Sequence, residues 1–231
     1  MIPSQSNEAE LTVNSTGYYV STGLKKQRKQ LFYLMVKRSL DITAAGAGLI
    51  CLAPFLLLLS LMILVEDPKG RVFFSQVRIG KDQKPFRIYK FRSMISNAEE
   101  LLDNLLGQNE IRGAMFKMKD DPRITRVGRF MRKTSLDELP QLFNVLKGDM
   151  SLVGPRPPLV REVAEYTEYD KQRLVVTPGC TGLWQVSGRN GLSFADMVEL
   201  DLSYIDNRGF LLDMKIIFKT FKVLIGSKDA Y

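Results

Sequence analysis

Two adjacent carboxylates, Asp137 and Glu138, are the residues of this sequence best suited to chemistry, because a run of basic residues leads directly into them. From residue 120 to residue 144 the chain reads DDPRITRVGRFMRKTSLDELPQLFN. Arginine recurs at every third position ahead of the carboxylates, at Arg123, Arg126, Arg129 and Arg132. Neighbouring carboxylates repel each other and any anionic substrate unless arginines or a divalent cation compensate. We therefore expect a magnesium ion near Asp137.

The local structure around the carboxylates has two interpretations. Ser135 and Glu138 have the spacing of a capping box, which would be a purely structural feature. Pro140 would then lie at the fifth helical position, where its missing N–H removes a hydrogen bond, although proline prefers the first turn. A helix that begins at about Asp137 removes this conflict. It also places both carboxylates at the positive end of the helix, which attracts phosphate.

Two further arginines lie in loops that contain proline or glycine. Arg156 is the third residue of the sequence GPRPP, where restricted φ values preorder its guanidinium for phosphate, although the motif is also compatible with a plain turn. The second loop, residues 178–190, surrounds a short strand and ends near Arg189. Its structural interpretation is a hairpin with Trp184 in the core, so that the functional question concerns only Arg189.

Residues 71–79 and 86–94 have the pattern of two strands joined by a loop. Alternation in the second strand places Lys90 and Arg92 on one face and Tyr89 and Phe91 on the other. The basic pair is either a solvated edge of the sheet or a phosphate-binding pair. Alternation alone favours the solvated edge, because lysines commonly protect exposed strands.

Residues 42–65 form a run of 24 residues without a charge, and Pro54 stands at its middle. A helix of this length extends roughly 36 Å and can cross a hydrocarbon core of about 30 Å. Basic residues crowd both ends of the run, and each flank therefore favours the cytoplasmic side. A helix that breaks at Pro54 and turns back satisfies both flanks. The alternative is a single-pass helix that tolerates the proline.

The composition excludes several mechanisms and leaves several partners open. The length of 231 residues supports one domain of about 150 residues beyond the membrane segment. A net charge of +8 fits anionic lipids, phosphorylated substrates or nucleic acid equally well. The chain has no histidine, which excludes a Ser-His-Asp arrangement, and its cysteines, Cys51 and Cys180, have no disulfide or metal spacing.

In residues 201–228, apolar residues at helical spacing alternate with lysines, which predicts either an interfacial helix or a helix packed on the core.

Several motifs together resemble the bacterial sugar transferases, the monotopic polyprenyl-phosphate phosphoglycosyltransferases. The resemblance covers residues 36–231 and rests on KFRSM at 90–94, RKTSLDELPQL at 132–142, KGDMS at 147–151, GPRP at 154–157 and the loop at 178–189. It implies an α+β fold with a re-entrant membrane helix broken at a proline, a small β-hairpin and a mainly helical catalytic domain with interfacial amphipathic helices. Family members often carry serine before the proline; Ala53 stands there in this chain, so a hydroxyl cannot assist the break.

The sequence and the resemblance together predict a domain organisation and a location. The polar composition of the N-terminal residues predicts a loosely ordered tail at 1–35, and the resemblance implies the re-entrant membrane helix at 36–66 and the catalytic domain at 67–231. The catalytic domain would lie on the cytoplasmic face of the bacterial inner membrane, against the lipid bilayer.

As the resemblance further implies, Asp137 attacks the sugar-bearing phosphate of a UDP-sugar, expels UMP and forms a covalent aspartyl phosphosugar. Undecaprenyl phosphate then attacks this intermediate, so that one difficult transfer becomes two steps. Glu138 would assist as base or metal partner, with Mg²⁺ bound near Asp137. UDP-glucose and UDP-galactose are the expected donors in exopolysaccharide or capsule synthesis, and a homodimer is left open. The residues that would hold phosphates are Lys90, Arg92, Arg132, Arg156 and Arg189.

Two rival functions come from other classes. A non-enzymatic basic membrane protein that binds polyanions explains the net charge of +8 but not the acidic pair among arginines. The sequence contains no recognised nucleic-acid motif, so nucleic acid is not an expected partner. The other rival is a membrane-anchored, metal-dependent glycosyltransferase that uses Asp120 and Asp121 and releases UDP instead of UMP.

Overall fold

The computed structural model describes residues 11–13, 19–98, 100–101, 105, 118, 121–188 and 191–226, and the chain divides into two compact units, Met1–Leu40 and Asp41–Tyr231. Strands β1 (Leu11–Val13) and β2 (Tyr19–Ser21) pair antiparallel in the first unit, which also contains the start of helix α1. Helix α1 therefore begins within the predicted tail at 1–35, whereas the predicted domains at 36–66 and 67–231 stay predictions. The helices and strands from α1 onward are α1 (Thr22–Glu66), β3 (Phe73–Ile79), β4 (Pro85–Phe91), α3 (Arg126–Thr134), α4 (Gln141–Lys147), β5 (Ser151–Val153), α5 (Val160–Ala164), α6 (Glu168–Lys171), β6 (Gly179–Thr181), α7 (Phe194–Asn207) and α8 (Phe210–Gly226), with 3-10 turns at Lys81–Gln83, Leu136–Glu138, Gln172–Val175 and Trp184–Val186.

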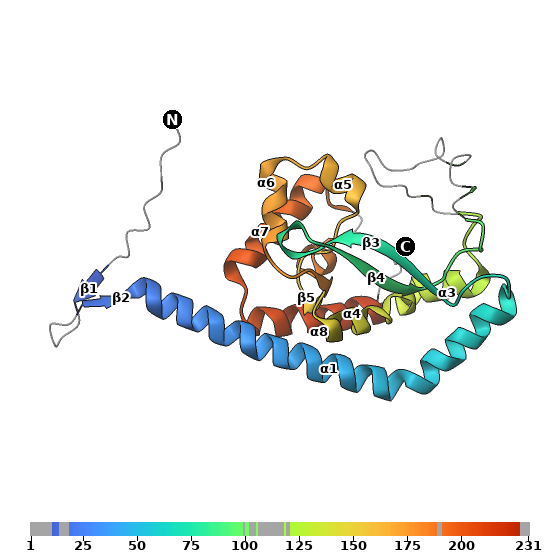
Figure 1. The fold of residues 1–231 in the computed structure, drawn as a ribbon, viewed down its shortest axis with the longest axis horizontal. Coiled ribbons are helices and arrows are strands. Elements are labelled where there is room, and N and C mark those ends of the chain that lie inside the picture. The colour runs from blue at the N-terminus through green and yellow to red at the C-terminus, as the bar shows by residue number, and fades with distance from the viewer. Residues whose placement is uncertain are drawn as a thin grey trace. The chain divides into compact units, whose positions relative to one another are not determined.

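Helix α1 carries the apolar run and continues past Pro54 without interruption. Figure 1 shows that its axis changes direction in the C-terminal half. Pro54 cannot donate a hydrogen bond to the carbonyl four residues earlier, and the Ser60 hydroxyl donates to the Leu56 carbonyl at 2.7 Å, a type of bond that often bends helices. Residues Gln30–Glu66 are long and apolar enough to cross a membrane. The helix is not interrupted at the proline, and the re-entrant path stays a prediction.

Strands β3 and β4 form the predicted antiparallel hairpin, which confirms the mixed helix and sheet fold. The register runs from Phe73 opposite Phe91 to Ile79 opposite Pro85, so β4 ends before Arg92. Because side chains alternate between the faces of a strand, one face of the hairpin carries Phe74, Gln76 and Arg78 from β3 together with Lys90, Ile88 and Phe86 from β4.

Helix α4 is attached to the edge of β4 by the side chain of Asn144, which is fully buried. Its amide nitrogen donates to the Arg87 carbonyl at 2.7 Å, and its amide oxygen accepts from the Tyr89 N–H at 3.0 Å. The side chain therefore substitutes for a neighbouring strand, because it satisfies one donor and one acceptor of the β4 backbone.

Asn144→Ala is expected to lower the free energy of unfolding by about 2 to 4 kcal/mol, since it removes a fully buried side chain and leaves two partly buried backbone groups without partners. Chemical denaturation followed by circular dichroism measures the loss. Asn207→Ala is the matched control, because Asn207 is exposed and its amide donates only to the Ser203 carbonyl, at 2.9 Å. That variant should stay within about 0.5 kcal/mol of the wild type. A loss below about 1 kcal/mol for Asn144→Ala would contradict the anchoring role.

The N-terminal end of helix α3 is joined by hydrogen bonds to the last residue of α1, and its C-terminal end leads into the acidic pair. The Glu66 carboxylate accepts hydrogen bonds from the backbone N–H groups of Arg126 at 2.6 Å and Val127 at 3.0 Å. These are N–H groups of the first helical turn, which have no partner within the helix. Gly128 packs against the chain that leaves β4, where an added Cβ would lie 2.0 Å from the Ser93 carbonyl oxygen. Glycine is therefore required for this close approach.

Strand β6 pairs in parallel with β5, which is distant in sequence. The predicted hairpin at residues 178–190 is therefore wrong, because the partner of this strand is not local. Gly154 and Gly179 allow the two connections to approach, since a Cβ on Gly179 would lie 2.1 Å from the Gly154 nitrogen. The loop with Arg156 is thereby held beside the start of β6.

One side of helix α8 is buried, and another side carries a stripe of exposed apolar side chains. Ile216 is fully buried with Val153 and Tyr204. Leu211, Phe218 and Phe221 recur on one side of the helix and are 82%, 69% and 59% exposed. Packing on the core therefore accounts for only part of this helix, and the interfacial role of the stripe stays a prediction.

Candidate active site

Asp137 and Glu138 lie on the 3-10 turn between α3 and α4. Ser135 precedes this turn in the left-handed conformation, with a φ of 56°, and its side chain makes no capping hydrogen bond. Helix α4 begins only at Gln141, with Pro140 as its N-cap, where the missing N–H removes no helical bond. The capping box is therefore wrong, and the predicted helix start at Asp137 is too early.

Glu138 is held by two cations. The Lys90 Nζ lies 2.6 Å from Glu138 Oε1, and the Arg156 Nη1 lies 4.0 Å from the same oxygen. Burial by itself raises the pKa of Glu138, but the charges of Lys90 and Arg156 and hydrogen bonds from Lys90 and Gln141 lower this pKa to about 2. Glu138 is therefore ionised at neutral pH and fixes the positions of both cations.

The environment of Asp137 shifts the pKa of its carboxyl group in the opposite direction to that of Glu138. The residue is 8% exposed, and burial, followed by the negative charge of Glu138, raises the pKa of its carboxyl group. The positive charges of Lys90 and Arg132 act against this rise. Arg132 is itself held by a hydrogen bond from its Nε to the Ser93 hydroxyl at 2.9 Å. Environments that separate the pKa values of two carboxyl groups commonly give them different chemical roles. Here Asp137 is the less stabilised anion of the two.

Arg78 is a cation of this site that the sequence reasoning missed. Its side chain is 8% exposed, and it lines the same hollow as Lys90, Glu138 and Arg156. Its Nη1 donates to the Pro157 carbonyl at 3.2 Å, in the loop that carries Arg156. Burial, and then repulsion from Arg156, lowers the pKa of Arg78 to about 10, so it remains charged. The available signal was its position on the same hairpin face as Lys90. The other residues that line the hollow are Ile88, Gln141, Pro157, Gly179, Cys180 and Gln185.

Cys180 also lines this hollow, but its environment does not activate the thiol as a nucleophile. Burial raises the pKa of the Cys180 thiol. The thiol is therefore protonated at neutral pH, and a protonated thiol is a poor nucleophile.

Arg92 lies away from the acidic pair. Its Nη1 donates to Asp67 Oδ2 at 3.1 Å, and its Nη2 donates to the Asp67 carbonyl at 2.5 Å, just beyond the end of α1. The backbone N–H of Ser96 donates to the same carboxylate at 3.0 Å. Arg92 therefore joins the hairpin to the end of α1, and this geometry does not support the predicted phosphate contact or the predicted common face with Lys90. Arg189 lies outside the described residues.

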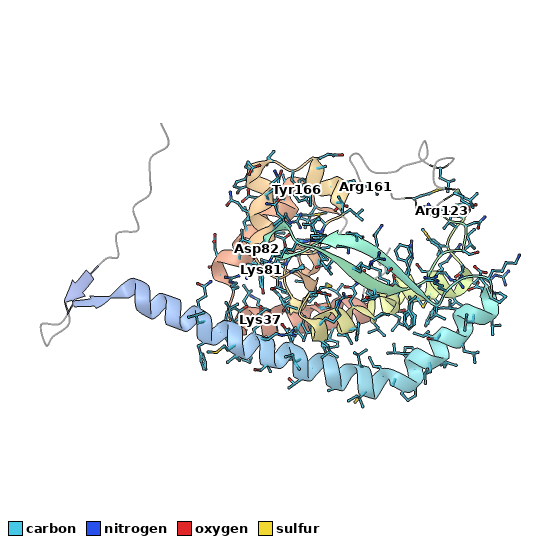
Figure 2. All side chains as sticks on the ribbon, viewed as in Figure 1. Lys37, Lys81, Asp82, Arg123, Arg161 and Tyr166 are labelled. Carbon is cyan, nitrogen blue, oxygen red and sulfur yellow. The ribbon has the colours of Figure 1, made fainter. Side chains whose placement is uncertain are left out.

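Asp121, which the rival glycosyltransferase would use on a metal, is paired with Arg123. The two side chains are nearly buried, and the Arg123 Nη2 and Nε lie 2.6 and 2.9 Å from the two carboxylate oxygens. Figure 2 shows Arg123 near the start of α3. Asp120 lies outside the described residues, and the described part of the chain contains no group of three or more His, Cys, Asp or Glu that could hold a metal ion. A two-point ion pair leaves Asp121 poorly placed as a metal ligand.

Comparison with known proteins assigns the chain to a family. The family described as bacterial sugar transferase matches residues 32–227. The chain belongs to this family. It is 48% identical over 215 residues to the galactosyl transferase CpsE of Streptococcus agalactiae serotype III, a match that covers 93% of this chain and 47% of that protein. It is 47% identical over 200 residues to the undecaprenyl-phosphate galactose phosphotransferase of Salmonella typhimurium, covering 85% and 42%.

A shorter relative is matched over most of its length. The chain is 40% identical over 201 residues to the exopolysaccharide production protein ExoY of Rhizobium meliloti, covering 85% of this chain and 88% of that protein. It spans about half the length of the other two relatives. The structure places Lys90, Arg132 and Arg156 around the acidic pair and adds Arg78, whereas their binding of phosphates stays a prediction.

Proposed function

We propose that this sugar transferase transfers a sugar 1-phosphate from a UDP-sugar to undecaprenyl phosphate and releases UMP. The observation that carries the proposal is the buried, weakly stabilised carboxylate of Asp137 beside Glu138, which Lys90 and Arg156 hold in its ionised form. The printed names of relatives support the substrates, since they include an undecaprenyl-phosphate galactose phosphotransferase and a UDP-galactose-lipid carrier transferase of Erwinia amylovora. UDP-galactose is therefore the first donor to test and UDP-glucose the second.

The reaction proceeds in two displacements at phosphorus. In the first, a carboxylate oxygen of Asp137 bonds to the sugar-bearing phosphorus of the donor, the bond to the bridging oxygen breaks, and UMP leaves with the electron pair. In the second, a phosphate oxygen of undecaprenyl phosphate bonds to the same phosphorus, and the Asp137 carboxylate leaves. The product is undecaprenyl diphosphate sugar, and the enzyme returns to its initial state.

The charges around Asp137 suit both displacements. Phosphoryl transfer is catalysed mainly by positioning and by positive charge around the transferred group. Arg132 and Lys90 act directly on the Asp137 carboxylate, and Arg78 and Arg156 line the adjoining hollow. Mg²⁺ is commonly held by one or two carboxylates together with substrate phosphates, and Asp137 and Glu138 are the carboxylates that would hold it. When bound, it would supply further positive charge to the phosphates.

We assign the reaction to the cytoplasmic face of the bacterial inner membrane, as part of exopolysaccharide or capsule synthesis. The apolar part of α1 and the exposed stripe of α8, formed by Leu211, Phe218 and Phe221, support a membrane setting. Lys215, Lys219 and Lys222 flank this stripe, an arrangement that suits contact with anionic lipid headgroups.

The product released from a panel of UDP-sugars tests the proposal. The full chain in nanodiscs, with undecaprenyl phosphate and Mg²⁺, is expected to release UMP from at least one donor and to lose this activity with EDTA. Without the acceptor, it should release a single burst of UMP that matches the amount of enzyme. Release of UDP would support the anchored glycosyltransferase instead, and no release from any donor would support the non-enzymatic rival.

Lys90→Met is expected to slow UMP release by roughly 100-fold, because it removes a positive charge next to both carboxylates. Steady-state rates at saturating donor measure the change. Lys84→Met is the matched control, because Lys84 is exposed in the loop between β3 and β4 and should leave the rate unchanged. A decrease smaller than about threefold for Lys90→Met would contradict the assigned role.

A further inference from the structure

An exposed aromatic side chain, that of Phe74, borders the candidate active site. Phe74 pairs directly with Lys90 across the β3–β4 hairpin. Residues directly opposite on antiparallel strands lie on the same face, with Cβ atoms about 5 Å apart. Arg78 and Ile88, on the same face, line the hollow that contains Glu138. Phe74 therefore lies on the hairpin face that is turned toward the site.

On its own face of the hairpin, Phe74 is more exposed than the other apolar side chains, Ile88 and Phe86. It is 39% exposed, whereas Arg78 and Ile88 on the same face are 8% and 4% exposed. The adjacent Phe73, on the opposite face, stacks on Phe91 with ring centroids 5.3 Å apart. Within the described part of the chain, Phe74 makes no such ring contact. An apolar ring left partly in water gains free energy when an apolar ligand covers it.

Phe74 also lies near the end of the hairpin that is joined to the C-terminal end of α1. Val72, two residues earlier, accepts a hydrogen bond from the Arg92 N–H at 2.8 Å, and the Arg92 guanidinium contacts Asp67 at the end of α1. An apolar chain that extends from the bilayer to Lys90 therefore passes Phe74.

We propose that Phe74 binds the first isoprene units of the polyprenyl phosphate acceptor. The inference rests on the proposed function and identifies a residue for the lipid within that site. In the acceptor, a branched apolar chain is attached directly to the phosphate. In the donor, the groups attached to the reacting phosphate are a sugar and a second phosphate, both polar. The neighbouring pair of Lys90 and Phe74 presents a cation beside an apolar ring, which matches the acceptor and not the donor.

Steady-state kinetics of Phe74→Ser and Phe74→Leu separate the two substrates. Val77→Ser is the matched control, because Val77 is 40% exposed on the same strand but on the opposite face. Phe74→Ser is expected to raise the KM for undecaprenyl phosphate about tenfold, in proportion to the lost apolar contact. Phe74→Leu and Val77→Ser should remain within about twofold of the wild type. The KM for the UDP-sugar and the UMP burst without acceptor should not change.

Other outcomes are distinguishable from this one. A raised donor KM or a weaker burst in Phe74→Ser would overturn the inference and place the ring against the nucleotide. An unchanged acceptor KM would overturn it as well. Absence of UMP release from the wild type would overturn the proposed function itself. As an independent measurement that does not depend on the serine variant, benzoylphenylalanine at position 74 should crosslink to bound polyprenyl phosphate, whereas the same group at position 77 should not.

Discussion

Replacing Asp137 with asparagine is expected to lower UMP release by at least about a thousandfold, because the amide cannot form the bond to phosphorus that the proposed mechanism requires. The substitution keeps the size of a side chain that is only 8% exposed, so the turn should remain folded. It also removes a carboxylate next to Glu138, and the loss of that repulsion favours the folded state. Rates with and without undecaprenyl phosphate, and the melting temperature, measure both effects.

The covalent intermediate can be detected in the same experiment. Intact-mass spectrometry of the wild type with donor alone should show the added mass of one sugar phosphate, which Asp137→Asn should lack. Asp206→Asn is the control, because Asp206 is exposed on α7 and should retain full activity. Glu138→Gln should retain the adduct but form it more slowly, since Glu138 positions Lys90 and Arg156. Retention of more than one tenth of the activity in Asp137→Asn would refute Asp137 as nucleophile.

Replacing Arg173 with methionine is expected to lower the free energy of unfolding by about 3 to 5 kcal/mol, because it leaves the buried Asp201 carboxylate without its counterion. Arg173 Nη2 contacts Asp201 Oδ2, and the two residues are 5% and 0% exposed. Arg173 also donates to the Tyr166 hydroxyl at 3.2 Å. In Figure 2, Tyr166 lies near α5 and α6, far from Arg123. The two buried ion pairs, Arg173–Asp201 and Arg123–Asp121, therefore stabilise different regions.

The pKa of Asp201 determines how the stability loss in Arg173→Met depends on pH. Burial raises the pKa of Asp201 from 3.8 to about 6, although Arg173 acts in the opposite direction. The stability that protonation of Asp201 contributes is therefore complete below pH 3.8 and is lost as the pH rises through about 6. The loss caused by Arg173→Met should accordingly be larger at pH 8 than at pH 5, because a protonated Asp201 needs no counterion.

Two further variants separate a buried pair from an ordinary one. The double variant Arg173→Met, Asp201→Leu should be more stable than Arg173→Met alone, because no unpaired charge remains inside. Lys171→Met breaks the exposed pair with Glu168, at 2.7 Å, and should cost no more than about 0.5 kcal/mol. Equal losses in the free energy of unfolding for Arg173→Met and Lys171→Met would show that burial does not increase the cost of breaking the Arg173–Asp201 pair.

The parts of the fold that depend on local patterns were predictable from the sequence. The β3–β4 hairpin follows from alternating residues around a short loop, and the long helix follows from the uncharged run. The placement of Asp137 and Glu138 among cations was also predictable, from the basic residues around them in the sequence and from the family resemblance. Their 3-10 turn was not predicted, because the left-handed Ser135 and the N-cap role of Pro140 depend on how α3 and α4 pack.

The roles of individual arginines could not be predicted in the same way. Arg92 and Lys90 stand two residues apart, yet one contacts Asp67 and the other Glu138. The difference arises because β4 ends between them, a boundary that alternation does not reveal. Arg78 was missed because its contact with Pro157 joins two segments 79 residues apart. The parallel pairing of β5 with β6 was missed for the same reason.

The contact between Glu66 and the first N–H groups of α3 makes this helix a spacer of fixed length. One end of α3 is attached to the end of α1, and the other leads into the turn that carries Asp137. Its nine residues correspond to about 13 Å. Inserting one residue would move Asp137 by about 1.5 Å and rotate it by about 100° around the helix axis. A chimera between members of this family would therefore have to exchange the end of α1, helix α3 and the turn with Asp137 as one piece.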